Sequence, residues 1–414
     1  MVGKPAGRID RGRHMGHSSS LRQIFLAFLR LGCVSFGGPV AHIGYFRNEF
    51  VDRRHWLDER GYADLVALCQ FLPGPTSSQV GMAIGIARGG IGGAFAAWAG
   101  FTAPSALLML LFAFGVTAAG EALGAGWLQG LKILAVAVVA GAVWGMARSL
   151  CPDRMRQGFA VFAAILVLAW PGPWGQVATI ALGAALGRLL LEPDSGAEAR
   201  PLDLRVGRRT GVALLALFFV LLAGLPLAAS VFPHHWLAVF DGFYRAGSLV
   251  FGGGHVLLPL LQGLVVPPGW VGSDAFLAGY GAAQAVPGPL FTLSAYLGAV
   301  IEPGGGVLLA LWCLAAIFLP SFLLVIGILP FWNRLRVQTG VQSALMGVNA
   351  AVVGLLAAAL YRPVWTGTIH NAGDFALLLL AFWAVAVARL PMWLVAPAAA
   401  GLGAAMAVYD GWNW

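Results

Sequence analysis

Residues 21–39 read LRQIFLAFLRLGCVSFGGP, an apolar run that is interrupted at Phe36-Gly37-Gly38-Pro39. Residues 236–254 read WLAVFDGFYRAGSLVFGGG and repeat the pattern F-x-x-F-x-R-x-G before a second F-G-G. Glycine permits open backbone angles and proline lacks an amide hydrogen, so each interruption ends one helix and starts the next. The two stretches therefore predict broken helical segments at corresponding positions of a duplicated chain.

A second pair of interruptions follows at nearly the same offset. Gln70-x-x-Pro73-Gly74-Pro75 corresponds to Gln284-x-x-Pro287-Gly288-Pro289. Further matches occur in the same order, so chance is a poor explanation; they pair Trp56 with Trp270, Trp98 with Trp312, and Pro104-Ser105 with Pro320-Ser321. The sequence therefore predicts two related halves, each with two broken segments.

The composition indicates that both halves lie in a lipid bilayer. Hydrophobic residues make up 59% of the 414 residues and charged residues 10%, against roughly 25% charged in soluble domains. Arginines lie in short clusters between apolar runs, which is typical of the cytoplasmic loops of membrane proteins and not of a nucleic-acid-binding face. Apolar runs that could cross a bilayer cover 91–117, 127–147, 157–171, 174–191, 210–231, 305–330, 341–361, 374–389 and 391–409.

Charge placement decides how the broken segments are threaded. Arginines follow both broken segments of the first half, and all stay on the cytoplasmic side only if each segment is a re-entrant hairpin. We therefore expect an all-α polytopic membrane protein with two inverted-topology repeats. Each repeat contains two broken hairpins and about four full spans, and a linker span joins the repeats.

The expected domains follow from this threading. They are a disordered basic cytoplasmic tail (1–20), an N-terminal repeat (21–191), a polar cytoplasmic linker with a connecting span (192–235), and a C-terminal repeat (236–414). The N-terminus is expected in the cytoplasm and the C-terminus outside, in a bacterial inner membrane. No Walker motif or C-x-x-C pair is present, so we expect no cofactor, no metal site and no catalytic residues.

The breaks are also the candidate substrate site. Inverted repeats with broken helices at matching positions point to a transporter site near the bilayer midplane. Each new helix start offers free amide hydrogens and a partial positive charge, which suit an anion. None of the four break motifs contains a carboxylate. The candidate residues in and beside the breaks are Gly37, Gly38, Gln70, Gly74, Pro75, Thr76, Ser77, Gly252, Gly253, Gln284, Gly288, Pro289 and Thr292.

Two arginines and two histidines complete the candidate set. Arg30 and Arg245 each precede an F-G-G tip by six residues, and an arginine at membrane depth costs at least about 2.5–3.5 kcal/mol on insertion scales. Two interpretations stay open for them: direct or indirect contact with the anion, or snorkelling to the interface. His42 and His255 follow their breaks and are interpreted either as structural histidines or as ligands.

At these residues the sequence resembles the chromate ion transporter family, in its long two-repeat form. The motifs are Phe36-Gly37-Gly38-Pro39 with His42, Phe71-Leu72-Pro73-Gly74-Pro75, and Phe251-Gly252-Gly253-Gly254-His255. The resemblance implies potential- or ion-gradient-driven export of chromate, and with it chromate resistance. Sulfate is an expected competitor because a hydroxyl- and amide-lined cavity accepts either tetrahedral dianion.

Several alternatives remain open at this stage. A sulfate or other oxyanion transporter, or a channel, would use the same breaks, and saturable flux with counterflow separates transport from a channel. A membrane-embedded enzyme would use His42, His255 or the charged segment 49–64, otherwise interpreted as an interfacial gate held by ion pairs. The expected partners are the oxyanion and the lipid bilayer, with a homodimer left open and no nucleic acid.

Overall fold

The regular elements are all helical in the residues that the structure, a computed structural model, describes. Those residues are 20–36, 38–119, 126–171, 173–193, 206–251, 257–302, 306–335 and 337–408. Gly37, Gly252, Gly253 and His255 lie outside this set, as do nearly all of the expected tail, most of the polar linker and the C-terminal end. The expectations for those residues stay predictions.

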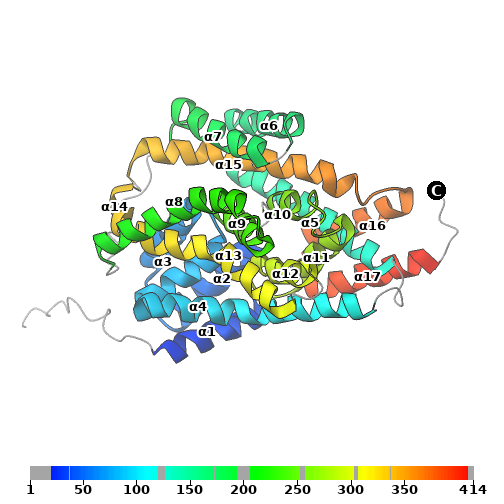
Figure 1. Cartoon of the computed structure of the whole chain (residues 1–414), viewed down its shortest axis with the longest axis horizontal. Coiled ribbons are helices and arrows are strands. Elements are labelled where there is room, and N and C mark those ends of the chain that lie inside the picture. The colour runs from blue at the N-terminus through cyan, green and yellow to red at the C-terminus, as the bar shows by residue number, and fades with distance from the viewer. Residues whose placement is uncertain are drawn as a thin grey trace, which may run out of the picture.

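The first repeat contains two broken hairpins followed by longer helices, and α8 connects it to the second (Figure 1). Its elements are α1 (Leu21–Val34), α2 (Gly38–Arg47), η1 (Asn48–Arg53), α3 (Glu59–Phe71), α4 (Thr76–Ala119), α5 (Gly126–Leu150), α6 (Arg154–Ala169) and α7 (Pro173–Leu190), with α8 at Arg208–Val231.

The second repeat follows the same plan. Its elements are α9 (His235–Leu249), α10 (Leu257–Val265), α11 (Ser273–Ala285), η4 (Leu290–Thr292), α12 (Leu293–Ile301), α13 (Gly306–Ile328), η5 (Leu329–Phe331), α14 (Trp332–Leu335), α15 (Thr339–Ala359), η6 (Leu360–Trp365), α16 (Ala372–Phe382), η7 (Trp383–Val387) and α17 (Met392–Val408).

The chain turns back at the break between α1 and α2. The rings of Phe28 and Phe46 lie 5.5 Å apart between centroids, whereas eighteen residues of straight helix would separate them by about 27 Å. The corresponding turn in the second repeat joins α9 to α10. There, a Cβ on Gly242 would lie 2.2 Å from the Leu264 side chain. The helices on either side of each F-G-G motif therefore pack against each other as a hairpin.

The long helix α4 also reverses, at Gly89 and Gly90. Gly90 has φ of 61°, and a Cβ on Gly85 would lie 2.2 Å from the carbonyl oxygen of Gly93. Eight residues of straight helix would span about 12 Å, so residues 76–88 form a re-entrant arm and residues 91–119 run back antiparallel to it. In the second repeat, α12 and α13 form the matching reversal, where a Cβ on Gly298 would lie 2.6 Å from the carbonyl oxygen of Leu309. The hairpin of α11 and α12, which corresponds to α3 and the first arm of α4, is closed by the Tyr296 hydroxyl donating to the Ala275 carbonyl at 2.9 Å.

Five helices are long and apolar enough to cross a membrane, by length and composition, in the described part of the chain. They are the helix at 76–115, whose second arm spans the membrane, together with α5, α8, α13 extended to Leu335, and α15 extended to Arg362. Only 6% of the most apolar window of α8 is buried, so we place this helix in lipid. At the expected spans 157–171 and 391–409, the helices α6 and α17 have 16 and 17 described residues, fewer than the roughly 20 residues that a full crossing needs.

The two repeats are interlocked through their later helices. α15 packs on α6 and α7, while α5 packs on α16 and α17 (Figure 1). Glycines let these backbones touch: a Cβ on Gly347 would lie 2.0 Å from the carbonyl oxygen of Gly183. A Cβ on Gly130 would lie at the same distance from the carbonyl oxygen of Ala399. Small residues at such contacts are the usual means of packing membrane helices closely.

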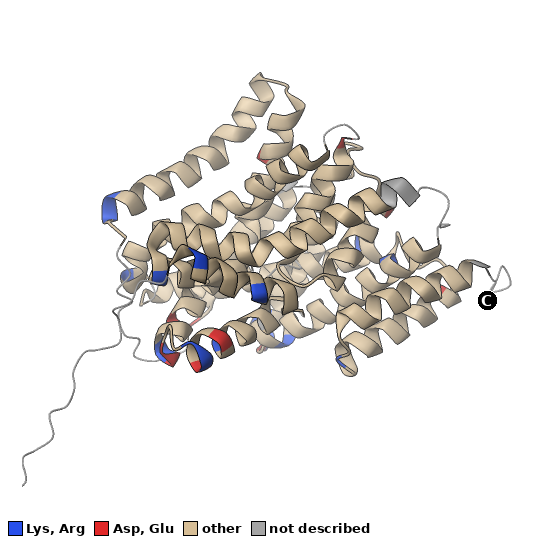
Figure 2. Cartoon of the chain, turned by 90° about the horizontal axis from the view of Figure 1, so that it is seen from below, with Lys and Arg blue, Asp and Glu red and all other residues tan. Residues whose placement is uncertain are grey.

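The connectivity makes the repeats inverted. Each hairpin returns the chain to the side from which it came. The arm 91–119 and α5 together do the same, and so does the shorter pair formed by α6 and α7. The single connecting helix α8 then starts the second repeat from the opposite side. Figure 2 shows the charged residues, coloured along the ribbon, gathered most densely at the lower left of the molecule, with mostly tan ribbon through its middle, as expected where lipid surrounds the middle.

Candidate functional site

Two reciprocal backbone hydrogen bonds join the four helix breaks. The amide of Gly74 donates to the Val250 carbonyl at 2.6 Å, and the amide of Gly288 donates to the Ser35 carbonyl at 2.9 Å. Each P-G-P loop of one repeat thus binds the F-G-G break of the other. The structure therefore brings the breaks of both repeats to one place, which we call the crossing.

The crossing leaves no room for side chains on its two central glycines. Gly74 has φ of 126° and Gly288 has φ of 100°, values that L-residues rarely adopt. A Cβ on Gly74 would lie 2.7 Å from Ser321 Oγ, and a Cβ on Gly288 would lie 2.8 Å from Ser105 Oγ. Ser105 and Ser321 occupy equivalent positions in the repeats, so the contact is nearly symmetric.

His42 ties the crossing to the start of α4. Its Nε2 lies 3.1 Å from the Ser35 carbonyl oxygen and its Nδ1 lies 3.2 Å from Ser77 Oγ. A carbonyl oxygen can only accept, so Nε2 carries the hydrogen and Nδ1 accepts from the Ser77 hydroxyl. The ring is 1% exposed. Both nitrogens have protein partners in this arrangement, which fits the structural interpretation of His42.

The helix starts that follow the P-G-P loops are buried and polar. Thr76, Ser77, Ser78 and Gln79 form the first turn of the α4 arm, and none is more than 8% exposed. In the second repeat, the Thr292 hydroxyl donates to the Pro289 carbonyl at 2.8 Å, within its own helix start. The two starts therefore differ: among the described residues, the start after Pro75 has unpartnered side-chain oxygens, at Ser78 and Gln79, and the start after Pro289 has none.

Five polar atoms at or next to the crossing are buried without a hydrogen-bond partner. They are Ser35 Oγ, Ser78 Oγ, Gln79 Oε1, Thr102 Oγ1 and Gln284 Nε2. Each buried polar group that lacks a partner costs about 1–3 kcal/mol. Such a concentration next to free helix-start amides indicates a place for a polar ligand, and the hydroxyl and amide hydrogens suit an anion.

The two arms of α4 carry Ser78 and Thr102 to the same level. Gly85 lies against Gly93, so seven further residues along each antiparallel arm set Ser78 opposite residue 100. Thr102 follows Phe101, whose carbonyl oxygen would lie 3.3 Å from a Cβ on Gly288 at the crossing. The Phe101 ring also meets the His42 ring, at 5.2 Å between centroids. Sequence reasoning missed Thr102 because nothing local marks it within an apolar run.

A sequence model of the family described as chromate transporter matches residues 22–188 and again residues 237–404. The chain belongs to the chromate transporter family. It is 30% identical over 346 residues to the chromate transport protein of Pseudomonas aeruginosa, covering 82% of this chain and 80% of that protein. A probable chromate transport protein of Synechococcus elongatus is 28% identical over 349 residues, covering 84% and 85%. No solved structure gives a significant match.

The two candidate arginines of the transporter lie in different surroundings. Arg30 is exposed on α1, away from the buried face formed by Ile24, Ala27, Phe28 and Leu31. Arg245 binds both carboxylate oxygens of Asp241, at 2.6 and 3.0 Å. Asp241 was not predicted from the sequence, although an acidic residue one helical turn before Arg245 could have indicated the pair. Its equivalent in the first repeat is Leu26, so the equivalent pair is absent there.

The two candidate glutamines also differ in their surroundings. Gln70 is exposed at the end of α3, whereas Gln284 is half-buried at the end of α11. Of the remaining candidates, Gly38 starts α2 with φ of 76° and Pro75 accepts the Gln79 amide at 2.9 Å through its carbonyl. Pro289 accepts from the Thr292 amide at 3.1 Å.

Replacing Asp241 by Asn should destabilise the transporter. The Asp241 side chain is 5% exposed, and its loss of charge leaves Arg245 without a counter-ion. A fully buried pair broken in this way costs about 3–5 kcal/mol, and the 37% exposure of Arg245 reduces our expectation to about 1–3 kcal/mol. Thermal unfolding in detergent measures it. Asp153→Asn is the control, since that exposed carboxylate also pairs with an arginine three residues away, and equal shifts would contradict the expectation.

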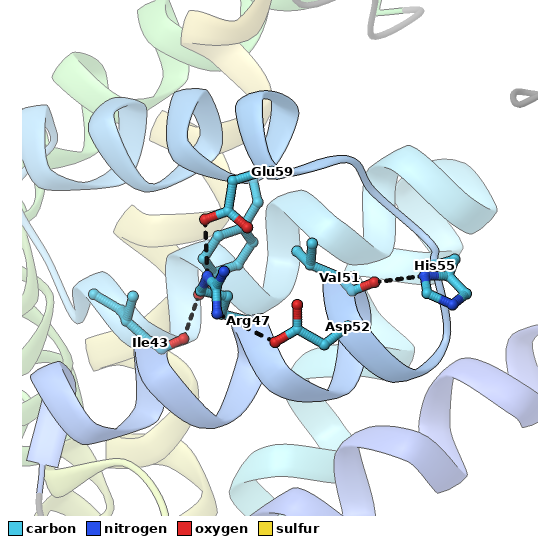
Figure 3. A network of polar contacts seen from close by, with 7 residues as sticks. Ile43, Arg47, Val51, Asp52, His55 and Glu59 are labelled. Atoms are coloured by element: carbon cyan, nitrogen blue, oxygen red, sulfur yellow. Dashed lines mark hydrogen bonds and ion pairs between the residues drawn. The ribbon is translucent and has the colours of Figure 1, made fainter.

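The charged segment 49–64 is held by ion pairs (Figure 3). Arg47 lies between Asp52 and Glu59, at 3.2 and 2.8 Å. Glu49 is 8% exposed and accepts from both Arg53 and Arg54. Among the described residues no group of three or more His, Cys, Asp or Glu side chains could hold a metal ion. The segment thus has the pairing expected of an interfacial gate.

Proposed function

We propose that this protein is a secondary transporter that exports chromate from the bacterial cytoplasm and thereby confers chromate resistance. The observation that carries the proposal is the crossing, where the breaks of both repeats meet and buried hydroxyl and amide groups at or next to them lack a partner, with no carboxylate in any break. Its relatives in Pseudomonas aeruginosa and Cupriavidus metallidurans are named chromate transport proteins, which supports this choice of oxyanion.

The proposed binding step replaces the water around the oxyanion with protein donors. The hydroxyls of Ser35, Ser78 and Thr102 and the amide of Gln284 supply hydrogens that no protein acceptor takes. Helix starts add a partial positive charge that is fixed in place before the anion arrives. These donors are neutral, so no protein counter-ion has to be separated from the anion when it leaves. As access alternates between the two sides of the membrane, the contacts that form and break are those of the hairpins that meet at the crossing.

The membrane potential supplies the direction of transport. We place the N-terminus and the arginine-rich loops in the cytoplasm, because positive charges favour that side. Each elementary charge gains about 2.3 kcal/mol per 100 mV, so a dianion leaving an inside-negative cell gains about 4.6 kcal/mol. At tenfold per 1.4 kcal/mol this supports a concentration ratio of over a thousandfold without ATP. Rocking of one repeat against the other would open the crossing to each side in turn.

Flux into sealed proteoliposomes tests the proposal. The purified protein is reconstituted and chromate movement is followed under an imposed potential of either sign, with protein-free vesicles as the control. We expect saturable, potential-dependent chromate flux that shows counterflow and needs no nucleotide. Flux that rises linearly without counterflow would indicate a channel, and comparable sulfate flux would widen the substrate to tetrahedral oxyanions. If neither anion moves, the proposed transport function is wrong.

A further inference from the structure

The amide of Gln79 has a fixed orientation at the crossing. Its Nε2 donates to the Pro73 carbonyl at 2.6 Å and approaches Ser321 Oγ of the other repeat at 3.4 Å. The opposite orientation would set two oxygens 2.6 Å apart without a hydrogen between them. The side chain therefore presents its Oε1 as the remaining polar atom.

Gln79 Oε1 is a buried acceptor without a donor. The residue is 0% exposed, and no hydrogen-bond partner reaches this oxygen. A carbonyl oxygen can only accept, whereas the unpartnered hydroxyls of Ser35, Ser78 and Thr102 can donate or accept by rotation. A fully ionised oxyanion would set its own lone pairs against this oxygen. An anion that carries a hydrogen of its own would satisfy this oxygen directly, whereas a fully ionised oxyanion would not.

We propose that the species bound at the crossing is hydrogen chromate, the monoprotonated anion, and that Gln79 selects it by accepting its hydrogen bond. This inference rests on the proposed chromate transport and deepens it. Chromate takes up its first proton near neutral pH, whereas sulfate does so only in strong acid. The two tetrahedral anions are alike in shape, but near neutral pH only chromate carries a hydrogen that it can donate to a fixed acceptor. Unpaired buried polar groups of this kind can discriminate strongly against a ligand that leaves them unsatisfied.

Selection of the monoprotonated anion lowers the net charge that crosses the membrane with each chromate. Hydrogen chromate carries one negative charge, and its proton leaves the cytoplasm with it. One charge at 100 mV supports a gradient of about fiftyfold, whereas a dianion supports over a thousandfold. The ratio of charge to chromate measured in vesicles thus reports the species bound.

Other titratable groups surround this part of α4 and must be separated from the substrate's own proton. His42 on α2 is the nearest, through Ser77. The remaining titratable or charged side chains on α4 and on the elements packed against it include Arg22, Arg30 and Cys33 on α1, Arg47 on α2, Glu59, Arg60, Tyr62, Asp64 and Cys69 on α3, Arg88 on α4, Asp274 and Tyr280 on α11, Tyr296 on α12, and Cys313 on α13.

The wild-type protein provides the first test. Chromate flux and charge movement are measured together in proteoliposomes between pH 6 and pH 8, with selenate as a tetrahedral anion that stays unprotonated over this range. We expect one charge per chromate. The apparent affinity for total chromate should fall about tenfold per pH unit above the protonation midpoint, and selenate flux should stay at least tenfold lower. Two charges per chromate with pH-independent affinity would overturn the inference, while absence of chromate flux at every pH would overturn the transport proposal itself.

A matched pair of variants assigns the effect to Gln79. Gln79→Leu removes the acceptor and gives the residue found at the equivalent position, Leu293. Ser321→Ala removes a contact of the same amide but keeps Oε1 in place. We expect the pH slope and the discrimination against selenate to disappear in Gln79→Leu and to persist in Ser321→Ala. A slope that survives in folded Gln79→Leu belongs to another group such as His42 and contradicts the inference. If Gln79→Leu does not fold, the wild-type charge ratio still decides.

Discussion

Gly74→Ala is expected to reduce chromate flux more than a hundredfold and to lower the unfolding temperature. The new Cβ would lie 2.4 Å from Gln79 Nε2 and 2.7 Å from Ser321 Oγ, in a backbone conformation with φ of 126°. Backbone strain of this kind costs of order 1–3 kcal/mol, and overpacking costs a similar amount. The loop must move to relieve both, which would break the hydrogen bond from Gly74 to Val250. Flux and thermal unfolding of the same preparation measure the two effects.

Gly269→Ala is the matched control for this variant. Gly269 has φ of 75°, and a Cβ there would meet nothing within 4 Å. It lies in the connection between α10 and α11, away from the crossing. We expect a modest loss of stability from the backbone alone and unchanged flux. Equal flux in the two variants would show that the crossing does not need its close contact.

The double variant Ser78→Ala, Thr102→Val is expected to weaken chromate binding by at least a hundredfold without destabilising the fold. Both hydroxyl oxygens are buried and unpartnered in the anion-free protein, so their removal takes away the desolvation free energy that their burial costs. A hydrogen bond to a charged group is worth about 1.5–3 kcal/mol, which is more than tenfold in affinity for each hydroxyl. Binding of chromate by the purified protein and its thermal unfolding should therefore change independently.

Thr179→Val provides the comparison for a buried hydroxyl that already has a partner. The Thr179 hydroxyl on α7 donates to the Gly175 carbonyl at 2.7 Å and the residue is 2% exposed. Its loss should lower stability slightly and leave chromate affinity as it is. A double variant that binds chromate normally would remove Ser78 and Thr102 from the site.

Much of the fold could be predicted because its signals are local. Glycine and proline at matching positions marked the breaks, and the length of the apolar runs marked α5, α8, α13 and α15. The reversal of α4 at Gly89 and Gly90 falls directly before the span expected at 91–117, so this boundary was also predicted. The spans expected at 157–171 and 391–409 have bounds within three residues of those of α6 and α17.

The site was predictable only in part, because its contacts join residues far apart in the chain. The P-G-P glycines and the first turn of α4 were found from their motif. The pairing of Gly74 with Ser321, and of Lys132 on α5 with Asp274 on α11 at 2.9 Å, depends on how two inverted repeats meet. Periodicity also could not show that Arg30 faces outward while Arg245 is neutralised by Asp241, since exposure depends on the neighbouring helices.

The location of bound chromate tests the central claim most directly. The measurement is an anomalous difference map at the chromium absorption edge from crystals of the protein grown with chromate. We expect one tetrahedral anion at the crossing, within hydrogen-bonding distance of Ser78 Oγ and Thr102 Oγ1. An empty crossing, with chromate bound instead along the arginine-rich segment 47–60, would contradict it.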